Sequence, residues 1–315
     1  MTPGTKDMTT GRPLSLLVRF ALPLMVGNVF QQLYTVVDTM VVGKALGVGA
    51  LAALGASDWL NWMMLGMIQG LTQGFAVLMA QAFGAKDRDG LRKTLGNSLV
   101  LCVISTGILL LLGQVFLQPV LRLMRTPDSV IGDSALYLRI MFGGIPIVMA
   151  YNFLACILRS VGDSKTPLYA MIVACGVNIG LDCLFVLLFG WGIPGAAAAT
   201  LIAQVCSAGY CLLRLGRIDL IRFEKPHLRL NRQLTGKLLR LGISMAFQNY
   251  KVGTPFLGEG TEWVGLKWFK QFINGPRFVE LLKNTLTLSL YSLVANWPFP
   301  ILCYPSSCPG KPCAV

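Results

Sequence analysis

Charged side chains are scarce in this chain. Only 13% of its 315 residues are Asp, Glu, Lys or Arg, whereas 54% are hydrophobic, and the mean hydropathy is +0.63. A soluble domain ordinarily carries about 25% charged residues. The composition therefore excludes an ordinary soluble globular protein and indicates a chain that crosses a membrane several times.

Residues suited to metal-dependent or nucleophilic catalysis are also few. The chain has one histidine, His227, and it lacks an HExxH metal motif. Six of the nine cysteines stand singly in apolar segments, where a thiol acts as a small hydrophobe. Cys303, Cys308 and Cys313 repeat every five residues without a nearby histidine, which is poor zinc spacing. We therefore expect no enzymatic activity and no bound cofactor.

Apolar runs long enough to span a bilayer, about 17 to 25 residues, occur six times. They lie at approximately 14–42, 48–82, 95–117, 134–158, 167–190 and 194–216. The sequence therefore predicts an all-α polytopic membrane protein with a six-helix bundle over residues 1–216. No short apolar stretch with a small-residue cleavage site comes first, so we expect the first run to remain as a membrane anchor.

The basic residues follow an alternating pattern along the chain. If the N-terminus faces inward, the inner loops 1–19, 84–94, 159–166 and 214–240 carry 17 Lys and Arg, and the opposite loops carry 3. This asymmetry is the positive-inside rule. It predicts a multi-pass protein of the cell (plasma or inner) membrane with a cytoplasmic N-terminus. It also accounts for the net charge of +13 without a nucleic-acid partner.

Two acidic residues lie away from the ends of predicted spans, Asp38 in the first and Asp182 in the fifth. An Asp at mid-bilayer depth costs about 2.5 to 3.5 kcal/mol, so it indicates a functional site. Asn178 shares a helix face with Asp182, and Thr200 follows small residues that let helices approach closely. If the three spans converge, these four residues offer oxygen ligands suited to H⁺ or Na⁺. The alternative is that each Asp only hydrogen-bonds a neighbouring helix.

Pro23 interrupts the first span 15 residues before Asp38, about 22 Å away along a helix. Proline removes a backbone hydrogen bond and kinks a helix. We therefore hypothesise that cation loading at Asp38 bends the helix at Pro23.

Large aromatic and methionine side chains cluster in the first two spans. They either line a cavity for flat organic cations or face lipid and neighbouring helices. These residues are Phe30, Tyr34, Trp59, Trp62, Met63 and Met64. Asp58, beside them, lies near the end of its span, where we expect a solvated mouth residue.

Residues 1–249 resemble the multidrug and toxic compound extrusion (MATE) family. The resemblance rests on Pro23 followed by Asp38, the loop AQAFGAKDRDGLRK, the loop LRSVGDSKTP, Asn178 with Asp182, and GAAAAT ending at Thr200. It implies a drug/cation antiporter whose amino-terminal lobe binds Na⁺ or H⁺ through Asp38, Asn178, Asp182 and Thr200. It also implies twelve helices in two similar six-helix lobes around a central cavity, and this chain has one such lobe.

The pattern changes after Asn249. Residues 217–249 form a basic linker and the start of a seventh helix, LTGKLLRLGISMAFQN. Residues 250–302 resemble a fragment of a sugar-type ABC importer permease with one further apolar helix, on the basis of WVGLKWFKQF and LLKNTLTLSLYS. Residues 303–315 form an unassigned tail. The alternative for the region after 249 is a divergent second MATE lobe.

Three functions fit these features. The first is multidrug efflux by H⁺- or Na⁺-coupled antiport of small organic cations. The second is a flippase for a lipid-linked glycan or similar amphiphile, which would need a more charged cavity, Arg139 being the main intramembrane cation. The third is a non-functional chimeric fragment, because alternating access needs one bundle to rock against another. Self-association of two copies would replace the missing lobe.

Overall fold

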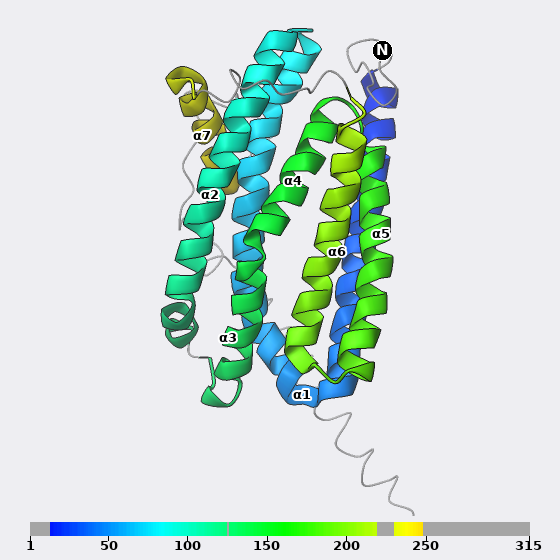
Figure 1. The fold of residues 1–315 in the computed structure, drawn as a ribbon, viewed down its shortest axis with the longest axis vertical. Helices are drawn as coiled ribbons and strands as arrows, with labels where there is room; N and C mark the ends of the chain where they lie inside the picture. The colour runs from blue at the N-terminus through cyan, green and yellow to red at the C-terminus, as the bar shows by residue number, and fades with distance from the viewer. Residues whose placement is uncertain (1–12, 125, 219–229, 248–315) are drawn as a thin grey trace, which may run out of the picture. The chain divides into compact units, whose positions relative to one another are not determined.

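The computed structural model describes residues 13–124, 126–218 and 230–247. All of them lie in the unit Met1–Tyr250. These residues are helical with short turns and without strands, which confirms the predicted all-α class (Figure 1). Residues 250–302 and the tail 303–315 lie outside the described ranges, so the permease resemblance stays a prediction.

The first helix, α1 (Pro13–Gly84), contains both of the first two predicted spans. A straight helix of 72 residues would be about 108 Å long, more than three times the hydrocarbon thickness of a bilayer. Gly47 breaks the helical backbone with φ 81° and ψ −172°, a conformation that glycine adopts readily. The chain descends along one half of α1, turns, and returns along the other half (Figure 1).

The remaining helices complete the bundle. They are α2 (Arg88–Leu123), α3 (Asp128–Gly143), α4 (Ile145–Ser160), α5 (Lys165–Asp182), the π-helix η1 (Cys183–Leu188), α6 (Gly192–Leu215) and α7 (Arg232–Phe247). In the described part of the chain, four helices are long and apolar enough to span a membrane, and α3 with α4, bent by 48°, makes a fifth span. Since Gly47 divides α1 in two, these elements account for the six predicted spans.

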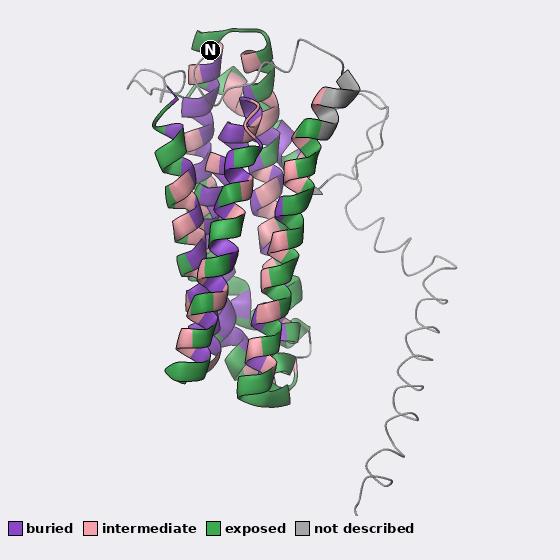
Figure 2. Ribbon diagram, turned by 90° about the vertical axis from the view of Figure 1, so that its right-hand side faces the viewer, coloured by how far each residue is buried: buried purple, intermediate pink, exposed green. Residues whose placement is uncertain are grey.

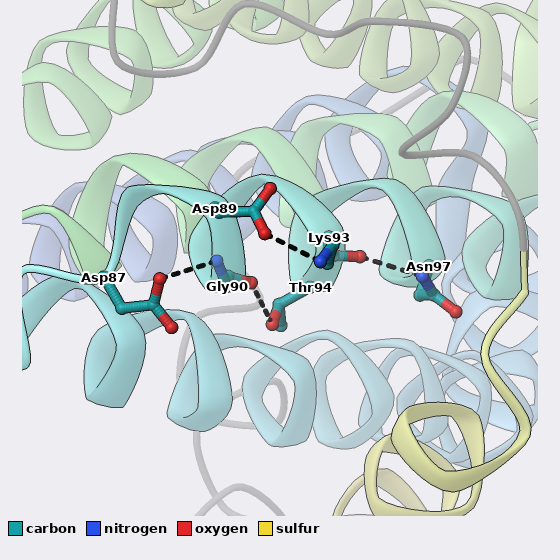
Figure 3. Close-up of polar contacts among 6 residues, drawn as sticks. All are labelled: Asp87, Asp89, Gly90, Lys93, Thr94 and Asn97. Carbon is teal, nitrogen blue, oxygen red and sulfur yellow. Dashed lines mark hydrogen bonds and ion pairs between the residues drawn. The ribbon is translucent and has the colours of Figure 1, made fainter.

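The turn between α1 and α2 is capped by its own side chains. The Asp87 carboxylate accepts a hydrogen bond from the Gly90 backbone N–H at 2.9 Å and so caps α2. One turn later, Asp89 and Lys93 form an ion pair at 2.7 Å (Figure 3). The Thr94 hydroxyl donates to the Gly90 carbonyl, also shown in Figure 3. The AQAFGAKDRDGLRK sequence is therefore a helix-starting turn.

The turn between α4 and α5 is also capped by an aspartate side chain. Asp163 accepts from the backbone N–H groups of Lys165 and Thr166 at 3.1 and 3.0 Å, and from the Thr166 hydroxyl at 2.6 Å. Gly162, just before it, has φ 86°. Both loops that carry the family resemblance thus act locally as caps that set where the next helix begins.

Burial follows the faces of the helices. Figure 2 shows the buried positions gathered on the inner sides of the helices and the exposed positions on the outer sides. Many of the exposed residues are large and apolar. Outward-facing side chains of α2 include Val103, Leu111 and Val115, at 64% to 66% exposure. At bilayer depth such a surface is compatible with lipid, since lipid tails are as apolar as leucine.

The helix α7 packs closely against the second half of α1. A methyl group built on Gly70 would lie 2.5 Å from the Ala246 Cα, and one on Gly74 would collide with Gly242. Small residues four apart on both helices allow this approach. The beginning of α7 is held by Asn97, whose side-chain oxygen accepts from the Asn231 backbone N–H at 2.8 Å. The predicted start of a seventh helix is therefore confirmed.

The break at Gly47 gives a first prediction. Gly47→Ala should destabilise the bundle by about 1 to 2 kcal/mol, because a side chain opposes positive φ. Gly49→Ala is the matched control: Gly49 is helical with open space around it, so alanine there should stabilise by about 0.5 to 1 kcal/mol. Thermal unfolding of the purified chain, followed by circular dichroism, measures both. Shifts of the same sign would contradict the assigned break.

Candidate cation site

The structure brings α1, α5 and α6 into contact and with them the four predicted site residues. Asp38 lies in the first half of α1, Asn178 and Asp182 on α5, and Thr200 on α6. The exposed fractions are 8% for Asp38, 1% for Asn178 and 0% for Asp182. Thr200 is half-buried. The four residues, spread over 162 positions of the sequence, therefore lie on three helices that contact one another.

Two hydrogen bonds orient the polar groups of the cluster. The Asn178 side-chain amide donates to the Thr200 hydroxyl at 3.4 Å, which joins α5 to α6. The same hydroxyl donates to the Ala196 carbonyl at 3.1 Å, within its own helix. The Asp182 carboxyl lies within electrostatic range of the Asp38 carboxyl on α1. The amide of Asn178 is thus turned to Thr200, which leaves its oxygen for another partner.

Four buried oxygen atoms in this cluster have no hydrogen-bond partner among the described residues. They are Asp38 Oδ1, Asn178 Oδ1, and both Oδ1 and Oδ2 of Asp182. Burying a carboxylate without a partner is costly, and proteins relieve this cost by pairing, protonation or a bound cation. Because neither oxygen of Asp182 is hydrogen-bonded, the alternative in which each Asp only bonds a neighbouring helix does not describe Asp182.

The ligands on offer are all oxygens. Among the described residues no group of three or more His, Cys, Asp or Glu lies together. Two carboxylates, one amide and one hydroxyl are hard donors, which suit a proton or an alkali cation better than a soft metal. The donor set therefore fits H⁺ or Na⁺, the ions predicted from the sequence.

The segment after Asp182 departs from the α-helix that the apolar run predicts. Residues Cys183–Leu188 form the π-helix η1, and π-helical turns occur frequently at functional sites. At its end Phe185 stacks on Trp191 with ring centroids 4.7 Å apart. The run 167–190 contains no proline near Cys183, and Asp182 immediately before it does not by itself predict a π-helix.

Tyr137 on α3 is a neighbour of the cluster that the sequence did not indicate. It is buried and lies within electrostatic range of Asp38, Asp58 and Asp182. Its position in the fourth span gave no signal, because the facing side of α3 depends on how the bundle packs. Tyr34, four residues before Asp38, is also within electrostatic range of that carboxyl.

The structure also locates Pro23 and four of the aromatic and methionine residues for which the sequence left a cavity or a lipid or helix contact open. The backbone around Pro23 stays helical, since Gly47 is the non-helical residue inside α1, and the bending hypothesis stays a prediction. Trp59, Trp62 and Met63 are exposed by 77%, 59% and 55%. Met64 is a core residue packed near Gly113 on α2, which fits the neighbouring-helix alternative and not a cavity.

One further acidic residue and one basic residue lie at the surface of the bundle. Asp58 is exposed, as expected for a mouth residue. Arg139 is also exposed, and its backbone carbonyl accepts from the Gln114 amide at 2.9 Å. Arg139 therefore does not form part of the buried cluster.

The unpartnered oxygens of Asp182 give a second prediction. In Na⁺-free buffer at alkaline pH, Asp182→Asn should stabilise the purified chain by about 1 to 3 kcal/mol, because it removes a buried carboxylate without a partner. Asp133→Asn, at an exposed carboxylate on α3, is the control and should change stability by less than about 0.5 kcal/mol. Thermal unfolding measures both. A destabilised Asp182→Asn protein would mean that this carboxylate is already paired.

Comparison with known proteins places these features in a family. Residues 23–184 match the MatE family model. The chain is 35% identical over 232 residues to the probable multidrug resistance protein YoeA of Bacillus subtilis, covering 71% of this chain and 50% of YoeA. It is 34% identical over 245 residues to the probable multidrug resistance protein YpnP of Bacillus subtilis, covering 77% and 54%.

Solved structures give the same picture. The crystal structure of MATE in the bent conformation matches with a TM-score of 0.70 and 27% identity, covering 75% of this chain and 53% of that one. The chain spans about half the length of the curated relatives it matches. With a family match that includes Asp38, Asn178 and Asp182, this chain is a member of the MatE family.

Proposed function

We propose that the described residues form the cation-binding amino-terminal lobe of a multidrug exporter, in which entry of H⁺ or Na⁺ drives export of small organic cations. The four unpartnered oxygens of Asp38, Asn178 and Asp182 are the observation that carries this proposal. The names of YoeA and YpnP, both probable multidrug resistance proteins, support the direction of transport.

In this proposal the cation is the switch between two states of the lobe. A bound H⁺ or Na⁺ neutralises the charge shared by Asp38 and Asp182 and links α1 to α5. When the cation leaves, like charges in a dry site repel one another, and α1 moves. The Thr200 hydroxyl accepts a hydrogen bond from the Asn178 side-chain amide. This bond positions Asn178 so that its side-chain oxygen faces the cation. A bend at Pro23 would carry this movement along α1.

The ion gradient supplies the energy for drug export. Exchange of one coupling cation for one monovalent drug cation moves no net charge, so the membrane potential contributes nothing to a one-for-one cycle. A tenfold gradient is worth about 1.4 kcal/mol for either ion, so a tenfold inward gradient of H⁺ or Na⁺ sustains a tenfold outward gradient of drug. The exposed Trp59 and Trp62 on α1 offer flat surfaces for aromatic cations.

The proposed orientation places the N-terminus in the cytoplasm and the chain in the cell membrane. The α1–α2 turn, the α4–α5 turn and the end of α6 all lie at the end of the bundle where α1 begins (Figure 1). These are the segments rich in Lys and Arg. Alternating access needs a second lobe, which we propose is supplied by self-association, with no cofactor beyond the coupling ion.

Efflux of ethidium from intact cells tests the proposed function. Cells that express the chain should hold less ethidium than cells without it, by up to about tenfold for each tenfold inward gradient of the coupling ion. Asp38→Asn should restore the level of cells without the chain, because the coupling site is lost. Asp133→Asn, at an exposed carboxylate on α3, is the matched control and should export normally. Equal ethidium in all four cell types, with each protein detected in the membrane, would leave the inactive fragment as the correct description.

A further inference from the structure

The candidate cation site lies off-centre along the bundle. The end of the bundle where α1 begins is rich in Lys and Arg, and we call it the basic end. Asn178 is thirteen residues along α5 from Lys165 at this end, a rise of about 20 Å. In the other direction, Asp182 is eight residues from Gly190, where the chain turns toward α6. A site that exchanges its ion with both sides in turn therefore needs a longer route toward the basic end.

The helices α5 and α6 lie side by side over this distance (Figure 1). Two contacts fix how they face each other: Asn178 to Thr200, and the Ser207 hydroxyl to the Ala170 carbonyl at 3.2 Å. The contacts are eight residues apart on α5 and seven on α6, so the helices run antiparallel. We use the name α5–α6 seam for the interface between these two helices from the Asn178–Thr200 contact to the end of the bundle that is rich in Lys and Arg.

Gln204 lies in this seam, about one helical turn nearer the basic end than Thr200. It is four residues after Thr200 and three before Ser207, so the three side chains share a helix face. The register places Gln204 opposite the stretch around Ala174, a buried residue with a small side chain. Gln204 Oε1 is buried and has no hydrogen-bond partner among the described residues. A buried side-chain oxygen in that position is available to a ligand.

Polar groups continue from Gln204 to the basic end of the bundle. The Ser207 hydroxyl is buried and donates to Ala170 and Ala203 carbonyls, which leaves its lone pairs as acceptors. Nearer the end, the Thr166 hydroxyl donates to Asp163. Successive groups on one helix face stand about one turn apart, roughly 5 to 6 Å.

We propose that the α5–α6 seam conducts the coupling cation between the Asp38–Asp182 site and the basic end of the bundle, with Gln204 as its first stop and Asp163 at its mouth. The proposal rests on the proposed function. The seam between the site and Asp163 offers uncharged oxygens from Gln204, Ser207 and Thr166, which coordinate a cation without trapping it. Asp163 places a carboxylate among the basic side chains at this end, within electrostatic range of Arg214, and is the group there that could receive a cation.

Thiol labelling from one side of the membrane tests this route. The full chain, with its nine cysteines replaced by serine, carries Gln204→Cys and is prepared in inverted and in right-side-out membrane vesicles. The probes are 2-aminoethyl methanethiosulfonate, a cation, and 2-sulfonatoethyl methanethiosulfonate, an anion. In inverted vesicles the cation should modify the Gln204→Cys protein at least tenfold faster than the anion does. Right-side-out vesicles should react more slowly with both reagents.

Val205→Cys is the matched control, because Val205 is the next residue and is 49% exposed on the outer surface of α6. Its thiol should react slowly with both reagents from both sides. If Gln204→Cys does not fold, Ala174→Cys on the facing side of the seam should give the same cation-selective labelling. Labelling without charge preference, labelling faster in right-side-out vesicles, or no labelling would overturn the route.

Failure of the route and failure of the proposed function are distinguishable. If thiols in the seam are accessible but ethidium efflux does not depend on Asp38, the proposed function is contradicted. If efflux depends on Asp38 but thiols in the seam are inaccessible, only the proposed cation route is contradicted. As a second readout, Gln204→Met should lower the rate of Asp38-dependent efflux at least tenfold, whereas Gln204→Asn, which keeps an uncharged amide oxygen at this position, should retain most of that rate.

Discussion

The structure depends on one constraint: carboxylate oxygens without partners are enclosed where water cannot reach them. Asp182 is fully buried, and neither of its oxygens meets a hydrogen-bond donor among the described residues. A soluble protein would satisfy such a group with water or a backbone N–H, and a membrane interior offers neither. The apolar packing of α1, α5 and α6 therefore encloses the candidate site, whose charge a bound cation neutralises in the proposed function.

The architecture around this site has features that place and isolate it. The break at Gly47 reverses α1 so that Asp38 lies on a helix beside α5. The bond between Asn178 and Thr200 ties α5 to α6 and turns an amide oxygen inward. The capped turns at Asp87 and Asp163 fix where α2 and α5 begin, and so fix which residues of those helices face the bundle.

The sequence predicted most of the bundle because apolar length, loop charge and turn residues are local signals. Asp38, Asn178 and Asp182 were also predictable, since a polar residue inside an apolar run is conspicuous. Tyr137 and the π-helix after Asp182 were not, because both depend on packing between segments distant in the sequence. Met64 shows the same limit: its sequence context allowed a cavity, lipid or a neighbouring helix, and only the position of Gly113 on α2 decides among them.

Infrared difference spectroscopy of the full chain tests the central claim most directly. Spectra are recorded before and after addition of Na⁺, and before and after acidification. The account predicts a change in carboxylate stretching bands for one of these ions, and loss of that change in both Asp38→Asn and Asp182→Asn proteins. A carboxylate signal that persists unchanged in either variant, or no signal with either ion, would contradict a cation site shared by these two residues.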